Sequence, residues 1–223
     1  MLINWYVVIY VVSIPGSELL TAALNVVSQS LQIPVIIFLL IFAIFAVFTF
    51  GGLISDYSSR IKLTREYKEK LVFSLVNASS IEELASIVNG SKIYDNQKEV
   101  LLKIINAHSL SSDSREAWAL NLIEEEEVIM AKSLEKVDIV TRIGPTLGLM
   151  GTLIPMGPGL AALGSGDVTT LANAIIVAFD TTVVGIGSGA VAYVISKIRR
   201  RWYEEYSSNL QLFVNAVLEN LNK

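Results

Sequence analysis

Three side chains in the apolar second half of the chain are of types that can bind or pass an ion. Thr152 and Thr182 each place a hydroxyl near the middle of a long apolar run, and Asp180 is the one acidic residue between Val168 and Ser196. A carboxylate at membrane depth is costly, so a functional or paired role is the default hypothesis. A threonine hydroxyl also bonds its own helix carbonyl readily. These residues therefore indicate either an ion path or ordinary intrahelical bonding.

The helical period separates Asp180 from Thr182. At 100° per residue the two side chains stand about 200° apart, whereas Asn173 lies within about 20° of Asp180. If Thr182 lines a pore, Asp180 therefore points toward neighbouring helices. The alternative is a protonated Asp180 that is simply hydrogen-bonded, either to Thr181 or to an adjacent helix.

Small residues and prolines recur beside these polar groups. Glycines at spacings of three and four permit close helix packing, which ordinary contacts within one subunit explain as well as a functional site does. The packing glycines are Gly144, Gly148, Gly151, Gly185 and Gly189. Prolines inside a helix remove backbone donors and predict kinks. They are Pro145, Pro155 and Pro158.

Three apolar runs are long enough to hold these residues in a membrane. Residues 33–54 contain no charge and exceed the roughly 20 residues needed to cross about 30 Å of hydrocarbon. Residues 139–163 and 168–196 are two further apolar stretches, separated only by a short turn at 164–167. The chain is 52% hydrophobic. We therefore predict one membrane helix followed by a transmembrane hairpin.

The basic residues set the orientation. All 17 Lys and Arg residues lie in residues 60–142 or 197–223, and basic segments stay on the cytoplasmic side during insertion. The predicted fold is an all-α polytopic membrane protein with its N-terminus outside and its C-terminus inside. Its segments are 1–32 (external or interfacial, with 2–14 not spanning), 33–54 (membrane), 55–138 (cytoplasmic helical domain), 139–163 (membrane), 164–167 (external turn), 168–196 (membrane) and 197–223 (cytoplasmic C-terminal helix).

The cytoplasmic segment is predicted to be helical. Residues 60–76 are rich in helix formers and are expected to continue the first membrane helix. Ser80 precedes Glu83 by three residues, a capping-box pattern that starts a short helix ending near Gly90. Residues 97–107 and 114–136 follow as further helices.

Several kinds of chemistry have no residues in this sequence. The chain has no cysteine and one histidine, which excludes thiolate metal sites and a His pair for zinc. We find no nucleophile beside a plausible base, and predict neither an enzyme nor a cofactor. A net charge of −4 gives no support for nucleic-acid binding.

Two segments of the predicted hairpin resemble the MotA/TolQ/ExbB proton-channel family. They are residues 144–152 (GPTLGLMGT) and 178–185 (AFDTTVVG), and the resemblance spans about residues 136–201. The order of segments, with one membrane helix, a cytoplasmic insert and a hairpin, is similar to that family as well. By this resemblance the pore threonines are Thr152 and Thr182, the latter within the Thr181-Thr182 pair.

The resemblance implies an assembly. The chain would form a homo-oligomer, a pentameric ring in a prokaryotic inner membrane, around two copies of a single-span ExbD/TolR/MotB-like protein whose Asp carries the ion. That complex would convert H⁺ or Na⁺ flow into mechanical work. Many relatives carry a Glu five residues before the third-helix threonine, where this chain has Val177. We hypothesise that Asp180 partly replaces it.

A different class of protein fits some of the same residues. In a structural or assembly membrane protein, the glycines would pack helices and Asp180 would pair with a neighbour, without ion flow. That interpretation predicts that Thr152 and Thr182 tolerate valine. A membrane enzyme or solute permease is less consistent with the sequence, because catalytic groups are lacking.

Overall fold

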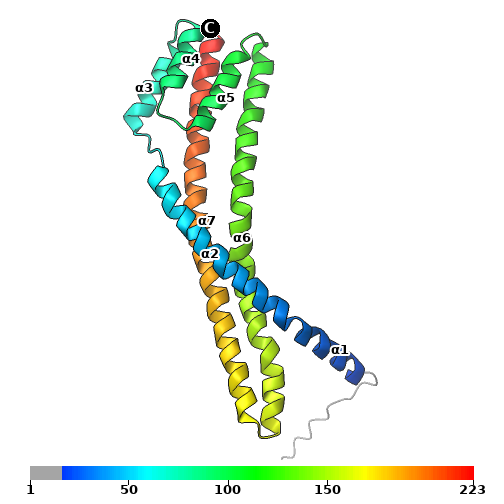
Figure 1. The fold of residues 1–223 in the computed structure, drawn as a ribbon. Coiled ribbons are helices and arrows are strands. Elements are labelled where there is room, and N and C mark those ends of the chain that lie inside the picture. The colour runs from blue at the N-terminus through cyan, green and yellow to red at the C-terminus, as the bar shows by residue number, and fades with distance from the viewer. Residues whose placement is uncertain (1–16) are drawn as a thin grey trace, which may run out of the picture. The chain divides into compact units, whose positions relative to one another are not determined.

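The computed structural model describes residues 17–223, which form seven α-helices (Figure 1). Residues 2–14, where we expect an external or interfacial segment, lie outside this range. The all-α prediction is confirmed. The helices are α1 (Ser17–Ser30), α2 (Gln32–Ser59), α3 (Arg65–Val76), α4 (Ile81–Gly90), α5 (Asp95–Asn106), α6 (Ser112–Gly164) and α7 (Val168–Leu221).

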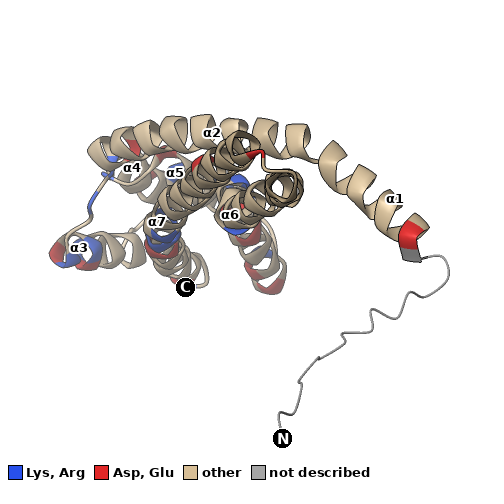
Figure 2. Cartoon of the chain, turned by 90° about the horizontal axis from the view of Figure 1, so that it is seen from below, with Lys and Arg blue, Asp and Glu red and all other residues tan. Residues whose placement is uncertain are grey.

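Three helical stretches are long and apolar enough to cross a membrane. They are Glu18–Ser59, Ser112–Gly164 and Val168–Leu221, and each contains one of the three predicted spans. Large apolar side chains on α2 are exposed, with Phe48 at 77%. A helix that is apolar on all sides is typical of a membrane span. In Figure 2 most of α2 accordingly carries no acidic or basic colour.

The first membrane helix ends earlier than predicted. We expected residues 60–76 to continue it, which is wrong, because α2 stops at Ser59 and α3 begins at Arg65. The Ile61 amide donates to the Tyr94 hydroxyl at 3.1 Å, and the Arg60 guanidinium pairs with Glu205 and lies 5.2 Å from the Trp202 ring centroid. These contacts from α5 and α7 outweigh the local helix propensity.

Helices α6 and α7 are longer than the segments drawn from the sequence. The predicted helix 114–136 and the span 139–163 belong to one helix, and so do residues 168–196 and 197–221. No glycine or proline lies between residues 114 and 143, so nothing in that stretch breaks the backbone ladder. Each helix therefore runs without a linker from an apolar run into a charged segment.

A hydrophobic core lies in the charged part of the chain. Helices α3, α4 and α5 bury leucine, valine and isoleucine side chains against residues 119–123 and 210–217, and we call this the helical bundle. Its most buried members include Leu75, Leu84, Leu101, Phe213 and Val217. The predicted helix start is confirmed, since the Glu83 amide donates to Ser80 Oγ at 3.1 Å and α4 runs from Ile81 to Gly90. The reciprocal contact of a capping box is shifted by one residue, because the Glu83 carboxylate accepts from the Ser79 amide at 2.8 Å.

By its internal contacts the chain divides into two compact units. One contains residues 17–42 with 145–186, and the other contains residues 43–144 with 187–223. The predicted threonines and packing glycines up to Gly185 lie in the first unit, apart from Gly144. The helical bundle lies in the second.

Candidate ion-path site

The close approach of α6 and α7 occurs at glycines. A β-carbon added to Gly151 would lie 2.6–2.9 Å from the Thr181 side chain, and one added to Gly148 would lie 3.1 Å from the Thr181 carbonyl oxygen. One added to Gly159 would lie 2.8 Å from the Ala174 β-carbon. Small residues are what allow two backbones to come this near. Gly151 and Thr181 therefore face each other directly.

This contact fixes which sides of the helix pair the other residues occupy. Helices α6 and α7 are antiparallel, so one step forward from Gly151 and one step forward from Thr181 turn to the same side of the pair. Thr152 and Thr182 thus share one side, and they share one level, because Gly148 and Gly151 both lie against residues 181–185. The structure brings the two predicted threonines together.

The threonine hydroxyls are bonded within their own helices. Thr152 Oγ1 donates to the Leu149 carbonyl at 2.7 Å, Thr182 Oγ1 to Ala178 at 2.8 Å and Thr181 Oγ1 to Val177 at 2.9 Å. A hydroxyl has one proton and two lone pairs. Thr152 and Thr182 are half-buried, and each hydroxyl proton is bonded within its own helix. The lone pairs of each hydroxyl oxygen therefore remain as hydrogen-bond acceptors. Such oxygens suit a cation or a hydronium ion.

Asp180 is not part of this pair. It precedes Thr181, so it turns to the opposite side from Thr182, as the helical period predicts. Its side chain is exposed, and within residues 17–223 no hydrogen bond or ion pair holds it. The Thr181 hydroxyl donates to the Val177 and Ala178 carbonyls, and the hypothesised bond between Asp180 and Thr181 is not among its contacts. Val177, at the position of the Glu of many relatives, is half-buried.

The side opposite the threonines is covered by α2. Val35 and Leu39 are 3% and 2% exposed and pack with Ile154, Leu147 and Val184. Relative to the contact between Gly151 and Thr181, Leu147, Ile154 and Val184 lie on the same side of the helix pair as Asp180. The hairpin therefore has its own first helix on one side, and Thr152 and Thr182 lie on the other side.

The remaining predicted residues lie within the same helices. Pro145, Pro155 and Pro158 are all inside α6, which continues through them, and the predicted kinks stay a prediction. The glycines at the ends of the ladder are buried. They are Gly144, Gly185 and Gly189.

Sequence reasoning missed the polar contacts just beyond the apolar runs. Asp56 follows the α2 run and pairs with Arg199 of α7 at 2.7 Å. Glu126 accepts from the Tyr206 hydroxyl at 2.9 Å, and burial followed by this bond raises the pKa of Tyr206 well above its ordinary value. The sequence did contain a signal for the pair of Asp56 and Arg199, because the two residues carry opposite charges and lie next to the ends of two spans.

The fold and the site define a class of protein. Three apolar helices, two of them in a tightly packed hairpin with paired mid-span hydroxyls, make this a multi-pass helical membrane protein. The sequence profile of the MotA/TolQ/ExbB proton channel family matches residues 94–211, more than half of the chain. The chain belongs to that family. No curated protein matches it.

Proposed function

We propose that this chain is the ring-forming subunit of an ion-driven stator, which converts H⁺ or Na⁺ flow into mechanical work. Five copies would surround two copies of a single-span, Asp-bearing partner in a prokaryotic inner membrane, with the helical bundle in the cytoplasm. The observation that supports this best is the Thr152 and Thr182 pair, at one level and on the side opposite α2. Family membership supports it independently.

In this proposal the two hydroxyl oxygens act as acceptors for the ion or for the carboxylic acid that carries it. Thr181 has a different part, since it is only 7% exposed and lies against Gly151. It holds α6 and α7 at the distance that keeps Thr152 and Thr182 level. The membrane potential would drive the ion with about 2.3 kcal/mol per charge per 100 mV.

The test is ion flux through the complex with valine at the two threonines. Removing one partner of a desolvated polar group costs about 1–3 kcal/mol, so Thr182→Val and Thr152→Val should each lower flux about 5- to 150-fold. Thr49→Val is the matched control, because Thr49 of α2 makes the same intrahelical bond, to Phe45 O at 2.7 Å. The complex would be reconstituted in liposomes with pH- and sodium-sensitive dyes.

The competing interpretation is a structural membrane protein without ion flow. It is favoured if Thr152→Val, Thr182→Val and Thr49→Val all leave flux and assembly unchanged. Native mass spectrometry of the chain co-expressed with a neighbouring single-span protein checks the assembly. A five-to-two complex supports the proposal, and a closed oligomer that never accepts the partner contradicts it.

In this proposal Asp180 does not line the ion path formed by Thr152 and Thr182. The proposal therefore predicts that Asp180→Asn keeps both the flux and its dependence on Thr182. The earlier hypothesis, in which Asp180 replaces the missing Glu, predicts instead that the pH dependence of flux changes in Asp180→Asn. Measuring flux over a pH series in this variant separates the two.

A further inference from the structure

A cavity lies where the apolar runs of α6 and α7 end. It has a volume of about 490 Å³ and is lined by α6 residues and by Arg200 of α7. Its lining includes the apolar Leu134, Ile139 and Ile143 together with Asp138. Since the apolar run of α6 begins at residue 139 and that of α7 ends at residue 196, this is where an ion leaving the membrane meets charged groups.

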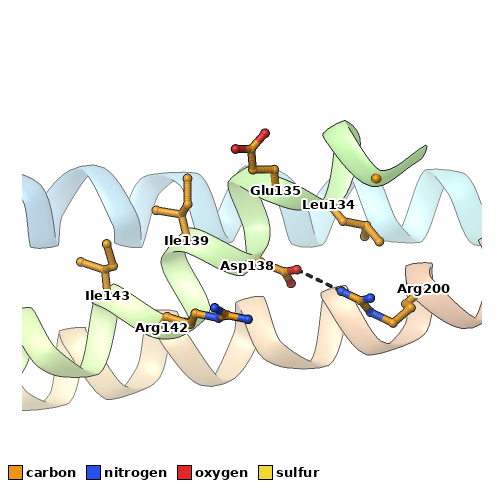
Figure 3. Close-up of a pocket in the computed structure, with 8 residues that line it drawn as sticks. Leu134, Glu135, Asp138, Ile139, Arg142, Ile143 and Arg200 are labelled. Atoms are coloured by element: carbon orange, nitrogen blue, oxygen red, sulfur yellow. Dashed lines mark hydrogen bonds and ion pairs between the residues drawn. The ribbon is translucent and has the colours of Figure 1, made fainter. Parts of the chain in front are cut away.

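Asp138 is held by two donors from the opposite helix. Ser196 Oγ donates to Asp138 Oδ1 at 2.5 Å, and the Arg200 guanidinium donates to Asp138 Oδ2 at 3.0 Å. Figure 3 shows the Asp138 carboxylate directed at Arg200, whereas Glu135 is directed away from it. The Asp138 side chain is 31% exposed and that of Arg200 50%. The carboxylate is therefore anchored but reachable by water.

Two further charges belong to the same cavity. Arg142 and Glu135 line it from α6, and within residues 17–223 neither makes an ion pair. The groups around Asp138 are thus Arg142 on its own helix and Ser196 and Arg200 on α7, whereas Glu135 is directed away from it (Figure 3).

Asp138 and Arg200 lie beside the charged ends of the two predicted spans. Asp138 directly precedes residue 139, where the apolar run of α6 begins, and Arg200 follows residue 196, where the apolar run of α7 ends, by four residues. We infer that Asp138 is the carboxylate that takes up the permeating cation at the inner end of the path and releases it to the cytoplasm, with Arg200 as its exchangeable counter-ion. This inference rests on the proposed function.

The step is a simple exchange. A proton arriving through water bonds to Asp138 Oδ2, the neutral acid releases Arg200, and loss of that proton to cytoplasmic water restores the ion pair. If the ion is Na⁺, the carboxylate and Ser196 Oγ are its oxygen ligands, and the Arg200 contact is broken and remade in the same way. Neither case needs a co-reactant.

The experiment measures ion flux in liposomes that hold the complete complex, with Asp138→Asn. The Asn amide oxygen accepts from Arg200 and its NH2 group donates to Ser196 Oγ, so a contact between the helices is kept while the titratable group is removed. We expect flux to fall about a hundredfold, the low end of what a positioned proton-transfer group contributes. Glu135→Gln is the matched control, since it removes a carboxylate from the same helix and the same cavity. It should keep wild-type flux.

The outcomes distinguish a failure of the proposed function from a failure of the role inferred for Asp138. Wild-type complex that carries neither H⁺ nor Na⁺ overturns the proposed function and this inference with it. Conducting wild-type complex together with equal conduction by Asp138→Asn overturns only the inference. Loss in both Asp138→Asn and Glu135→Gln also contradicts it, because cavity charge alone would then explain the effect.

A second set of variants covers the case in which Asp138→Asn does not assemble. Asp138→Glu restores a carboxyl group and should assemble and recover flux in part, whereas Ser196→Ala leaves the carboxylate with Arg200 alone and should slow release. An ion pair with only a structural role predicts that Ser196→Ala changes thermal stability but not flux. That result contradicts the inference.

Discussion

Gly151→Ala tests the close approach of α6 and α7 most directly. A β-carbon at this position would lie 2.6 Å from Thr181 Cβ, which is closer than two carbon atoms can pack. Thr181 is buried, and the nearest atom is the root of its side chain and cannot rotate away. Either the helices separate by several tenths of an ångström or the Thr181 backbone shifts. Both loosen the level pairing of Thr152 with Thr182.

The expected size follows from two opposing effects. Overpacking a tight contact costs about 1–3 kcal/mol, and replacing glycine by alanine inside a helix returns about 0.5–1 kcal/mol. The net loss is about 0.5–2 kcal/mol in the free energy of unfolding. Gly157→Ala is the matched control on the same helix, since nothing lies within 4 Å of an added β-carbon there. It should be neutral or stabilising.

The assay is thermal unfolding of the purified oligomer in one detergent for all three proteins. For a chain of this size about 1 kcal/mol shifts Tm by roughly 2–4 °C, so Gly151→Ala should unfold a few degrees below the wild type. If both alanine variants unfold at or above the wild-type temperature, the close contact between Gly151 and Thr181 does not exist. The assignment of Thr152 and Thr182 to one side would then lose its basis.

Three other predictions concern groups outside the spans. Phe213→Ala empties a fully buried position of the helical bundle and should cost about 3–5 kcal/mol, seen as faster proteolysis of the bundle. Tyr206→Phe removes the donor to Glu126 and should cost about 0.5–1.5 kcal/mol. Burial and the bond to Glu126 raise the folded pKa of Tyr206. The contribution of this contact is therefore fully present below pH 10 and is lost as the pH rises beyond it toward the folded pKa, which tyrosinate absorbance follows. The pKa of Asp167 is lowered by the Thr170 hydroxyl and amide, so Thr170→Val should raise it toward 3.8 in an NMR titration. The support that this carboxylate gives α7 is fully present above 3.8 and is lost as the pH falls through the lowered folded pKa.

The sequence predicts the spans and the charged bundle because both depend on local composition. An uncharged run such as residues 33–54 needs no partner to be recognised, and Ser80 with Glu83 carries its own helix start. The break at residues 60–64 has a different origin. It depends on Tyr94 and Glu205, which lie 33 and 145 residues away along the chain, and no local pattern contains that information.

The candidate site also has some features that the sequence predicts and others that it does not. Glycine spacing and the resemblance indicate the residues of the site, and the helical period separates Asp180 from Thr182. The sharing of one side by Thr152 and Thr182 follows only once Gly151 is known to face Thr181. The triplet of Asp138, Ser196 and Arg200 was not predicted, because its members are 58 and 62 residues apart and each resembles an ordinary boundary residue.

Helices α6 and α7 are uninterrupted, so the number of residues between two positions fixes the angle between their side chains around the helix axis. One residue inserted between the span and the charged segment of α6 would rotate everything beyond it by about 100° and advance it by about 1.5 Å. Asp138 would then turn away from Ser196 and Arg200, although every local sequence remained intact. An insertion of seven residues leaves an angular error of only about 20°, but it advances Asp138 by about 10.5 Å along the axis. A length change at this boundary of α6 therefore keeps the contact only if α7 changes by the same length, whereas the non-helical segment at residues 60–64 has no such angle to preserve.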